Sequence, residues 1–300
     1  MKNRARGILL LLITTLIWGS AFVSQSIATA YLDAFSFQAL RCLFAVAILL
    51  PIIAVSDRFQ KDGKHFLSRW ADGRLWKAGI LCGVPLFLAS NLQQLGLVDT
   101  DSGKAGFLTA MYIVIVPIFG VVRGKKLPRM MTPLCVLLAA AGLYFLSCAG
   151  VHTLGVSDLL LIGCAVLFAV QITFVDIYAG STDGLRLNAI QIAVCGILSA
   201  AVMLIRGENP TWQAIGSCLL PLAHTGFLSM GLAYGLQILA QKHLDATTAS
   251  LLMSLESVFA ALFGAVLLQE RLDAWELLGC ALIFAAVILS QLPDRRKHSR

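Results

Sequence analysis

Ten apolar stretches, separated by short clusters of charged residues, follow one another along the 300 residues of this chain. A transmembrane helix takes about 20 mostly apolar residues, which is close to the length of each stretch. Charged residues make up only 13% of the chain. An ordinary soluble domain has about 25%, so these charges are too few to cover a soluble fold of this size. We therefore expect an all-α membrane protein with ten transmembrane helices. They are 7–28, 35–55, 75–97, 103–122, 132–147, 157–178, 187–205, 215–240, 246–268 and 274–292.

Lysine and arginine indicate the orientation of these helices, because connections on the cytoplasmic side of a membrane carry an excess of both. With the N-terminus in the cytoplasm, 18 of the 23 basic residues fall in inside segments, and two, Arg206 and Arg271, fall outside. We expect a multi-pass protein of the cell (inner) membrane with both termini in the cytoplasm. The same distribution argues against nucleic-acid binding, which needs basic residues gathered on one face. The expected partners are membrane lipids and a small molecule.

The first 30 residues have a second interpretation. A basic stretch, an apolar stretch and the small residues 28–30 (ATA) are also typical of a secretory signal peptide with its cleavage site. We favour a retained first helix, because its removal would leave nine helices and break the alternation of charge.

The eight cysteines do not indicate a metal or a redox centre. No two are spaced as CxxC, and most lie inside expected helices, where cysteine packs as a small apolar residue. Cys148 and Cys218 both fall near the expected outer face, and their spacing leaves open whether they form a disulfide. We expect no metal and no cofactor, apart from the proton coupling considered below.

The two halves of the chain resemble each other at a shift near 150 residues. Gln38 matches Gln191 at a shift of 153, and Gln93 matches Gln237 at a shift of 144. Five helices in each half is an odd number, so the second half would cross the membrane upside down relative to the first. Such inverted repeats are typical of secondary transporters, whose substrate site lies near the middle of the membrane between the repeats. The expected domains are 7–147 and 156–291, five helices each around a central cavity, and a basic cytoplasmic tail, 292–300.

Four short motifs give the chain a resemblance to a known family. They are residues 18–22 (WGSAF), 37–41 (FQALR), 103–107 (GKAGF) and 269–272 (QERL). On these motifs the chain resembles the EamA-type transporters of the drug/metabolite transporter superfamily, over nearly its whole length. The resemblance implies ten helices in two EamA repeats around a central cavity, and export or uptake of small metabolites.

Glu256 lies midway along the ninth expected helix, near the centre of the membrane. A charge at that depth costs at least about 2.5 kcal/mol, so an ionisable residue there marks a functional site by default. Glu256 is the first candidate for proton coupling or for binding a charged group of the substrate. The alternative is a structural ion pair or a protonated, hydrogen-bonded carboxyl. Arg41, in the second expected helix, is expected to hold a substrate anion, to pair with Glu256, or to extend its long stem outward to the membrane surface.

Polar residues gather in the third and eighth expected helices, which the repeat makes equivalent. Tyr234, Gln237 and Gln241 follow the spacing i, i+3, i+7 and therefore share a helix face. Unpaired amides are costly in lipid, so these side chains should face a wet cavity or other helices. His224 either titrates near neutral pH or binds a carbonyl. The candidates for the substrate cavity are Trp18, Asn91, Gln93, Gln94, Tyr112, Gln171, His224, Tyr234 and Gln237.

These features together favour a secondary active transporter, with export as the preferred direction. We expect it to move a small amphipathic metabolite, such as an amino acid or a drug-like compound, by alternating access, as a monomer or a homodimer. An uncoupled facilitative carrier or a channel is the alternative, although a channel needs rings of like groups along a pore. An intramembrane enzyme is a weaker alternative. The chain has no HExxH, GxSxG or DDxxD motif, and its one mid-membrane carboxylate lacks a second with which to share acid–base chemistry.

Overall fold

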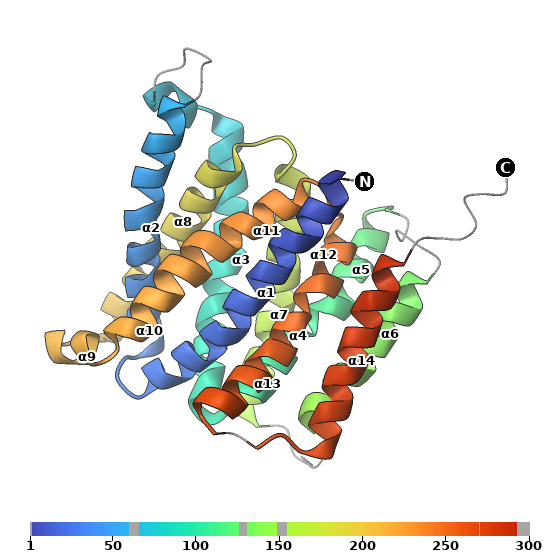
Figure 1. The fold of residues 1–300 in the computed structure, drawn as a ribbon. Coiled ribbons are helices and arrows are strands. Elements are labelled where there is room, and N and C mark those ends of the chain that lie inside the picture. Colours follow the sequence, from blue (N-terminus) through green and yellow to red (C-terminus); the bar gives the residue numbers. More distant parts are fainter. Residues whose placement is uncertain (1, 60–65, 126–130, 149–154, 270, 293–300) are drawn as a thin grey trace, which may run out of the picture.

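The fold is a bundle of helices, seen in a computed structural model that describes all residues except 1, 60–65, 126–130, 149–154, 270 and 293–300 (Figure 1). The basic tail, Glu270 of the fourth motif and the side chain of Cys148, on which predictions fall, lie outside the described residues. The helices are α1 (Lys2–Thr29), α2 (Ala34–Arg58), η1 (Leu67–Trp70), α3 (Gly73–Gly96), η2 (Leu97–Asp99), α4 (Ser102–Ala110), α5 (Tyr112–Val122), α6 (Thr132–Cys148), α7 (Val156–Tyr178), α8 (Gly184–Arg206), α9 (Trp212–Ser217), α10 (Leu219–Ala223), η3 (His224–Ala233), α11 (Tyr234–Gln241), α12 (Ala246–Met253), α13 (Leu255–Leu267) and α14 (Ala274–Gln291).

Each of the ten expected stretches coincides with a helical segment. Among the described residues, nine segments are long and apolar enough to cross a membrane, and a shorter apolar helix covers Thr132–Phe145, where the fifth was expected. The largest difference in bounds is at the start of the chain, where α1 begins at Lys2 rather than at residue 7. The apolar pattern therefore located the helices closely.

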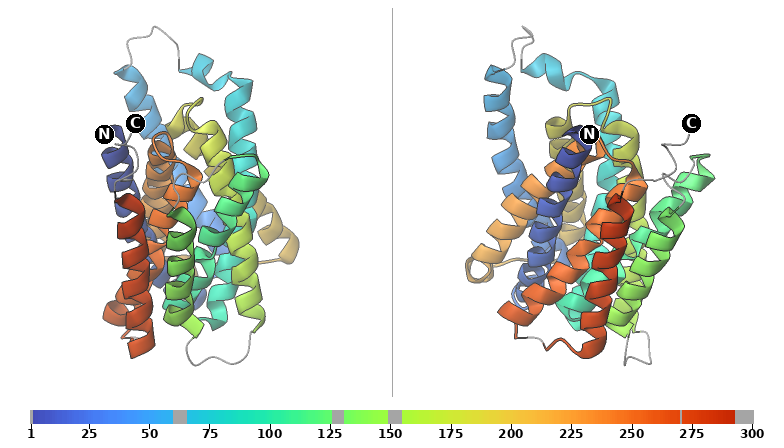
Figure 2. Two further views of the ribbon diagram at one scale, coloured as in Figure 1. Left: turned by 90° about the vertical axis from the view of Figure 1, so that its right-hand side faces the viewer. Right: turned by 45° about the vertical axis from the view of Figure 1, so that its right-hand side comes forward.

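The two halves of the chain pack against each other rather than forming separate bodies. α2 lies against α8, α6 against α14, and α3 against α7 and α8, and the two views of Figure 2 show α6 and α14 side by side. α1 begins and α14 ends at the upper end of the bundle in Figure 1, and Arg4 Nη2 donates to Gln291 Oε1 there at 3.1 Å. We refer to this as the upper end and to the opposite one as the lower end.

Three of the expected helices are interrupted, which the apolar pattern did not predict. α4 gives way to α5 at Met111, and α12 gives way to α13 at Ser254. The Ser254 hydroxyl donates to the carbonyl of Leu251 at 2.8 Å, and Ser257 donates to Ser254 at 2.7 Å. Such bonds from a side chain to the preceding turn compete with the helical pattern and bend a helix. The eighth expected helix contains a π-helical segment, η3, a rare form that often occurs at functional sites.

Candidate functional site

A cavity lies in the middle of the bundle, where the two halves meet. It has about 470 Å³ of space that atoms do not fill, its open part included. Its lining is Trp18, Ala21, Phe22, Gln25, Arg41, Gln93, Thr109, Tyr112, Phe168, Gln171, Ile172, Ser229, Met230, Tyr234, Gln237 and Glu256. Eight of the eleven residues that the sequence suggested therefore lie on one lining, between aromatic side chains and amides. The rings of Trp18 and Tyr234 contact each other there, with their centroids 4.8 Å apart.

Tyr112 and Glu256 join the two halves at this cavity. Tyr112 is the first residue of α5, Glu256 is the second residue of α13, and both are buried. The Tyr112 hydroxyl donates to Glu256 Oε1 at 2.8 Å. Glu256 thus lies in the first turn of a helix that starts inside the bundle, where the partial positive charge of a helix N-terminus favours a carboxylate. In the described part of the chain, no basic side chain forms an ion pair with it.

Arg41 is turned toward amide groups rather than toward Glu256 or the membrane surface. Its side chain is buried, Nε donates to Gln38 Oε1 and Nη1 donates to Gln25 Oε1, both at 2.7 Å. The guanidinium also lies over the Phe37 ring, 5.2 Å from its centroid. Of the three alternatives for Arg41, this conformation therefore shows neither the pair with Glu256 nor the outward extension. The guanidinium instead contacts two amide oxygens and one aromatic ring, which match its planar arrangement of N–H donors.

A chain of amides runs along the second half of the lining. Gln237 Nε2 donates to Gln171 Oε1 at 3.3 Å, and Gln171 Nε2 donates to Gln191 Oε1 at 3.2 Å. Gln191 Nε2 then donates to Asn188 Oδ1 at 3.0 Å, and Asn188 Nδ2 donates to the carbonyl of Gly231 at 2.8 Å. Because each amide of this chain donates to the next, α7, α8, η3 and α11 are held together beside the cavity.

Three of the suggested residues lie away from the cavity lining. Asn91 Nδ2 donates to Ser199 on α8 at 2.9 Å, and Gln94 Nε2 donates to the carbonyl of Gln25 at 3.2 Å. His224 lies between the hydroxyls of Ser20 and Ser24, at 3.2 and 2.9 Å. Each has found partners on a neighbouring helix. The spacing of Asn91 and Gln94 predicts that they share one face of a helix. It does not predict which neighbouring helix packs against that face.

The sequence reasoning missed three polar residues of the lining, which are Gln25, Thr109 and Ser229. Gln25 had a usable signal, since it is an amide inside an apolar helix and such groups face the protein interior. Thr109 and Ser229 had none, because small hydroxyl residues also serve close helix packing. Gln93 Nε2 donates to Thr109 at 3.3 Å, a contact between α3 and α4 that only the fold brings about.

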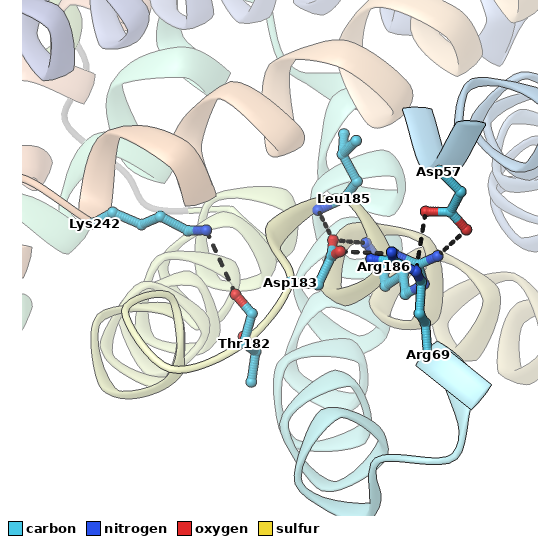
Figure 3. A network of polar contacts seen from close by, with 7 residues as sticks. All are labelled: Asp57, Arg69, Thr182, Asp183, Leu185, Arg186 and Lys242. Atoms are coloured by element: carbon cyan, nitrogen blue, oxygen red, sulfur yellow. Dashed lines mark hydrogen bonds and ion pairs between the residues drawn. The ribbon is translucent and has the colours of Figure 1, made fainter. Parts of the chain in front are cut away.

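A second polar cluster joins α2 to α8 at the upper end of the bundle. Figure 3 shows Arg186 between Asp183 and Asp57, with Arg69 directed at the same Asp57 carboxylate. Arg186 is almost fully buried, and its guanidinium lies 5.4 Å from the centroid of the Trp70 ring. A buried cation with two carboxylates fixes the relative position of the elements that carry them, so we interpret this cluster as a structural joint between the halves.

A second hollow, of about 660 Å³ with its open part included, lies at the upper end between α5, α7 and α12. Lys125 Nζ contacts Asp176 Oδ2 at 2.5 Å on its wall, and Asp176 Oδ1 accepts a hydrogen bond from the Ala246 backbone N–H at 3.1 Å. Thr173 and Thr247 also line it. Tyr112 of α5 lines the central cavity, and Val116, one turn nearer the upper end, lines this hollow, so the two spaces follow each other along α5.

The corresponding contact at the lower end, between α4 and α13, is closed. Glycine is needed there, because a Cβ added to Gly106 would stand 2.9 Å from the Cβ of Ala260. A Cβ added to Gly103 would lie 3.6 Å from the Cβ of Ala261, an ordinary van der Waals contact. In this conformation the described residues thus form a hollow above the cavity, and α4 and α13 are in close contact below it.

Comparison with known proteins gives one family over both halves of the chain. The model of the EamA-like transporter family matches residues 5–148 and again residues 155–292. An uncharacterized transporter of Archaeoglobus fulgidus is 30% identical over 282 residues, which are 94% of this chain and 84% of the relative. The threonine/homoserine exporter RhtA of Escherichia coli (strain K12) is 30% identical over 165 residues, about half of each chain (54% and 55%). A solved crystal structure covers 98% of this chain and 99% of its own, with a TM-score of 0.76 and 19% identity, and so supports the fold alone.

Proposed function

The chain belongs to the EamA-like transporter family, and from this premise we propose that it is a secondary active transporter that exports a small amphipathic metabolite. It is a multi-pass membrane protein, and the family and the names of its relatives point to transport rather than to an enzyme. The name of the Escherichia coli relative, a threonine/homoserine exporter, favours a small amino acid as the substrate and export as the direction.

The observation that carries this proposal is Glu256, a buried carboxyl on a cavity between the two halves. It is held by one tyrosine, with no basic side chain paired to it among the described residues. A carboxyl without a cation in a membrane interior is free to exchange a proton or to bind a cationic group of the substrate. We propose that Glu256 does so in turn, which would couple export to proton entry.

We further propose ten membrane-crossing helices in two inverted repeats, 7–147 and 156–291, in the inner membrane, with the upper end of the bundle in the cytoplasm. The match of the family model to both halves supports a duplication. The contacts of α2 with α8 and of α6 with α14 support the inverted relation, because each pair holds the same place in the two halves. The excess of basic residues in the upper connections supports the orientation.

Alternating access is the mechanism that we propose, and the inequality of the two ends supports it. Inverted repeats can exchange their conformations, so that the end that is open in one state is closed in the other. Thr247, in the upper hollow, and Gly103, in the lower closed contact, are 144 residues apart and hold the same place in the two halves. We propose that the present conformation is open toward the cytoplasm, and that the opposite state opens between α4 and α13.

Thiol labelling at this matched pair tests the mechanism. Thr247→Cys and Gly103→Cys would each be introduced into a variant without the eight native cysteines, and reconstituted in proteoliposomes. A water-soluble maleimide should label position 247 and spare position 103, and a condition that drives transport should raise labelling at 103 while it lowers labelling at 247. Labelling of both positions at once, unchanged by any driving condition, would indicate a continuous channel instead.

A further inference from the structure

The amide chain of the second half has a fixed direction, because it ends on groups that can only accept. One end is the carbonyl of Gly231, to which Asn188 donates. The other is the carbonyl of Ile172, to which Gln241 Nε2 donates at 3.1 Å. A backbone carbonyl has no hydrogen to give, so Asn188 and Gln241 must each turn their nitrogen toward it and their oxygen toward the next amide. The same reasoning fixes which atom is nitrogen and which is oxygen in the amides that link Asn188 to Gln241.

Gln237 joins the two branches of this amide chain, the one that ends at the carbonyl of Gly231 and the one that ends at the carbonyl of Ile172. Its Nε2 donates to Gln171 Oε1 at 3.3 Å and to Gln241 Oε1 at 3.0 Å, so both of its N–H groups are used. Its Oε1 is buried and accepts no hydrogen bond from any described residue. Turning the amide round would set its oxygen against two other oxygens, so the orientation is forced. One acceptor of the chain is left over, and it belongs to a residue of the cavity lining.

A buried acceptor without a donor costs free energy, so in a native protein a water molecule or a ligand supplies the missing hydrogen bond. Asn91 Oδ1 and Gln94 Oε1 are also without a donor in the described part of the chain, but neither residue is part of the cavity lining. On the lining, Trp18 Nε1 is the complementary case, a buried N–H without an acceptor. Among the described residues of the lining, Gln237 Oε1 and Trp18 Nε1 are thus a buried acceptor and a buried donor without a partner, beside the charged groups of Glu256 and Arg41.

We infer that Gln237 Oε1 accepts a hydrogen bond from the amino group of the transported molecule, an inference that rests on the proposed transport function. A primary ammonium group carries three donors and one positive charge. It therefore suits an amide acceptor and the Glu256 carboxyl, which both belong to the cavity lining. In the first half the oxygens of Gln25 and Gln38 each accept a hydrogen bond from Arg41, and the matching residue, Gln93, is bonded through its Nε2, which donates to Thr109. Gln237 therefore selects molecules with N–H donors and discriminates against those whose nitrogen is fully methylated.

Competition between two probes tests this role of Gln237. The full-length protein in proteoliposomes would be given L-threonine and its N,N,N-trimethyl derivative, which keeps the positive charge and lacks every N–H donor. The wild type should prefer L-threonine by about tenfold or more, the usual size of one lost hydrogen bond to a buried partner. Gln237→Met, of similar volume but with no acceptor, should reduce this preference to about threefold or less.

Gln241→Met is the matched control, because Gln241 belongs to the same amide chain and is not part of the cavity lining. It should keep the wild-type preference, and its melting temperature should match that of Gln237→Met, which separates a lost contact from a lost fold. If Gln237→Met keeps the full preference, the discrimination is one of size and the inference is overturned. If the wild type carries other metabolites but no amino acid, the inference also fails while the proposed transport stands. If no metabolite is carried at all, the proposed function fails.

Discussion

The first and second halves of this molecule build the same scaffold around the cavity but place different chemistry on it. α2 begins at Ala34 and α8 at Gly184, 150 residues apart, after the N-cap residues Asp33 and Asp183. These helix starts give a shift of 150 here, in place of the 153 that matched Gln191 to Gln38, so Arg41 corresponds to Gln191. Each of the two is bonded to an amide three residues earlier. At the shift of 144, Tyr112 corresponds to Glu256, and the two bond to each other.

The difference teaches where the polarity of the cavity comes from. A strict repeat would place two like charges on a small cavity, which repel each other at short range in a medium of low polarity. Here one half supplies a cation, Arg41, and the other supplies a carboxyl, Glu256. The repeat thus positions the side chains, and the departures from the repeat give the cavity its two charges.

The same contrast holds at the two ends of the contact between α2 and α8. At the upper end Arg186, near the start of α8, pairs with Asp57 at the end of α2. At the lower end Ser36, which is 150 residues before Arg186, donates through both N and Oγ to Glu208 Oε2, at 2.8 and 2.9 Å. In each joint a carboxylate therefore approaches the first turn of the opposite helix. At the upper end it meets the Arg186 cation, and at the lower end it accepts from a serine and pairs with Arg206 from its own side of the contact.

The largest expected effect on stability comes from the ionic joint. Arg186→Met should lower the free energy of unfolding by about 3 kcal/mol or more, because it removes the buried cation between Asp57 and Asp183 and leaves Asp57 with the longer contact to Arg69, at 3.9 Å. Ser36→Ala should cost only about 1 kcal/mol, because the backbone N–H of residue 36 still binds Glu208. Unfolding of both variants in mixed micelles, by titration with a denaturing detergent, measures the difference. Equal costs would mean that the two joints are energetically alike.

A smaller effect is expected at the cavity wall. Arg41→Gln, which gives the first half the residue of the second, should lower the free energy of unfolding by about 2 kcal/mol, since two charge-assisted hydrogen bonds to Gln25 and Gln38 are lost. Gln191→Met should cost about 1 kcal/mol, because its bonds join neutral amides. The same titration applies, with circular dichroism to verify that each variant keeps its helices. A larger cost for Gln191→Met would contradict the view that Arg41 organises its half.

The apolar pattern predicted the fold closely and the interruptions of its helices not at all. Hydropathy averages over about 20 residues. It therefore located the membrane-spanning segment that contains Glu256, but not the break at Ser254, where α12 ends and α13 begins. That end depends on single hydroxyls, such as that of Ser254, and on what packs against them. The π-helical segment η3 was missed for the same reason.

The candidate site was predictable where a residue type is costly in a membrane. Glu256, Arg41 and Gln237 stood out on that ground, and all three lie on the cavity lining. Partners across helices were not predictable, because a helix face does not specify its neighbour. His224 was therefore predicted to line the cavity, although its ring lies between the hydroxyls of Ser20 and Ser24.

The central claim is that the carboxyl of Glu256 couples transport to protons, and one measurement tests it most directly. Proteoliposomes containing the wild type, Glu256→Gln or Tyr112→Phe would be loaded with labelled L-threonine and given an imposed pH gradient, and efflux would be recorded with and without it. The wild type should respond to the gradient. Tyr112→Phe should respond with a shifted pH profile, because it keeps the carboxyl and removes the tyrosine hydroxyl that donates to it. Glu256→Gln should retain exchange of threonine and lose all response to the gradient. Full gradient-driven efflux by Glu256→Gln would contradict the account.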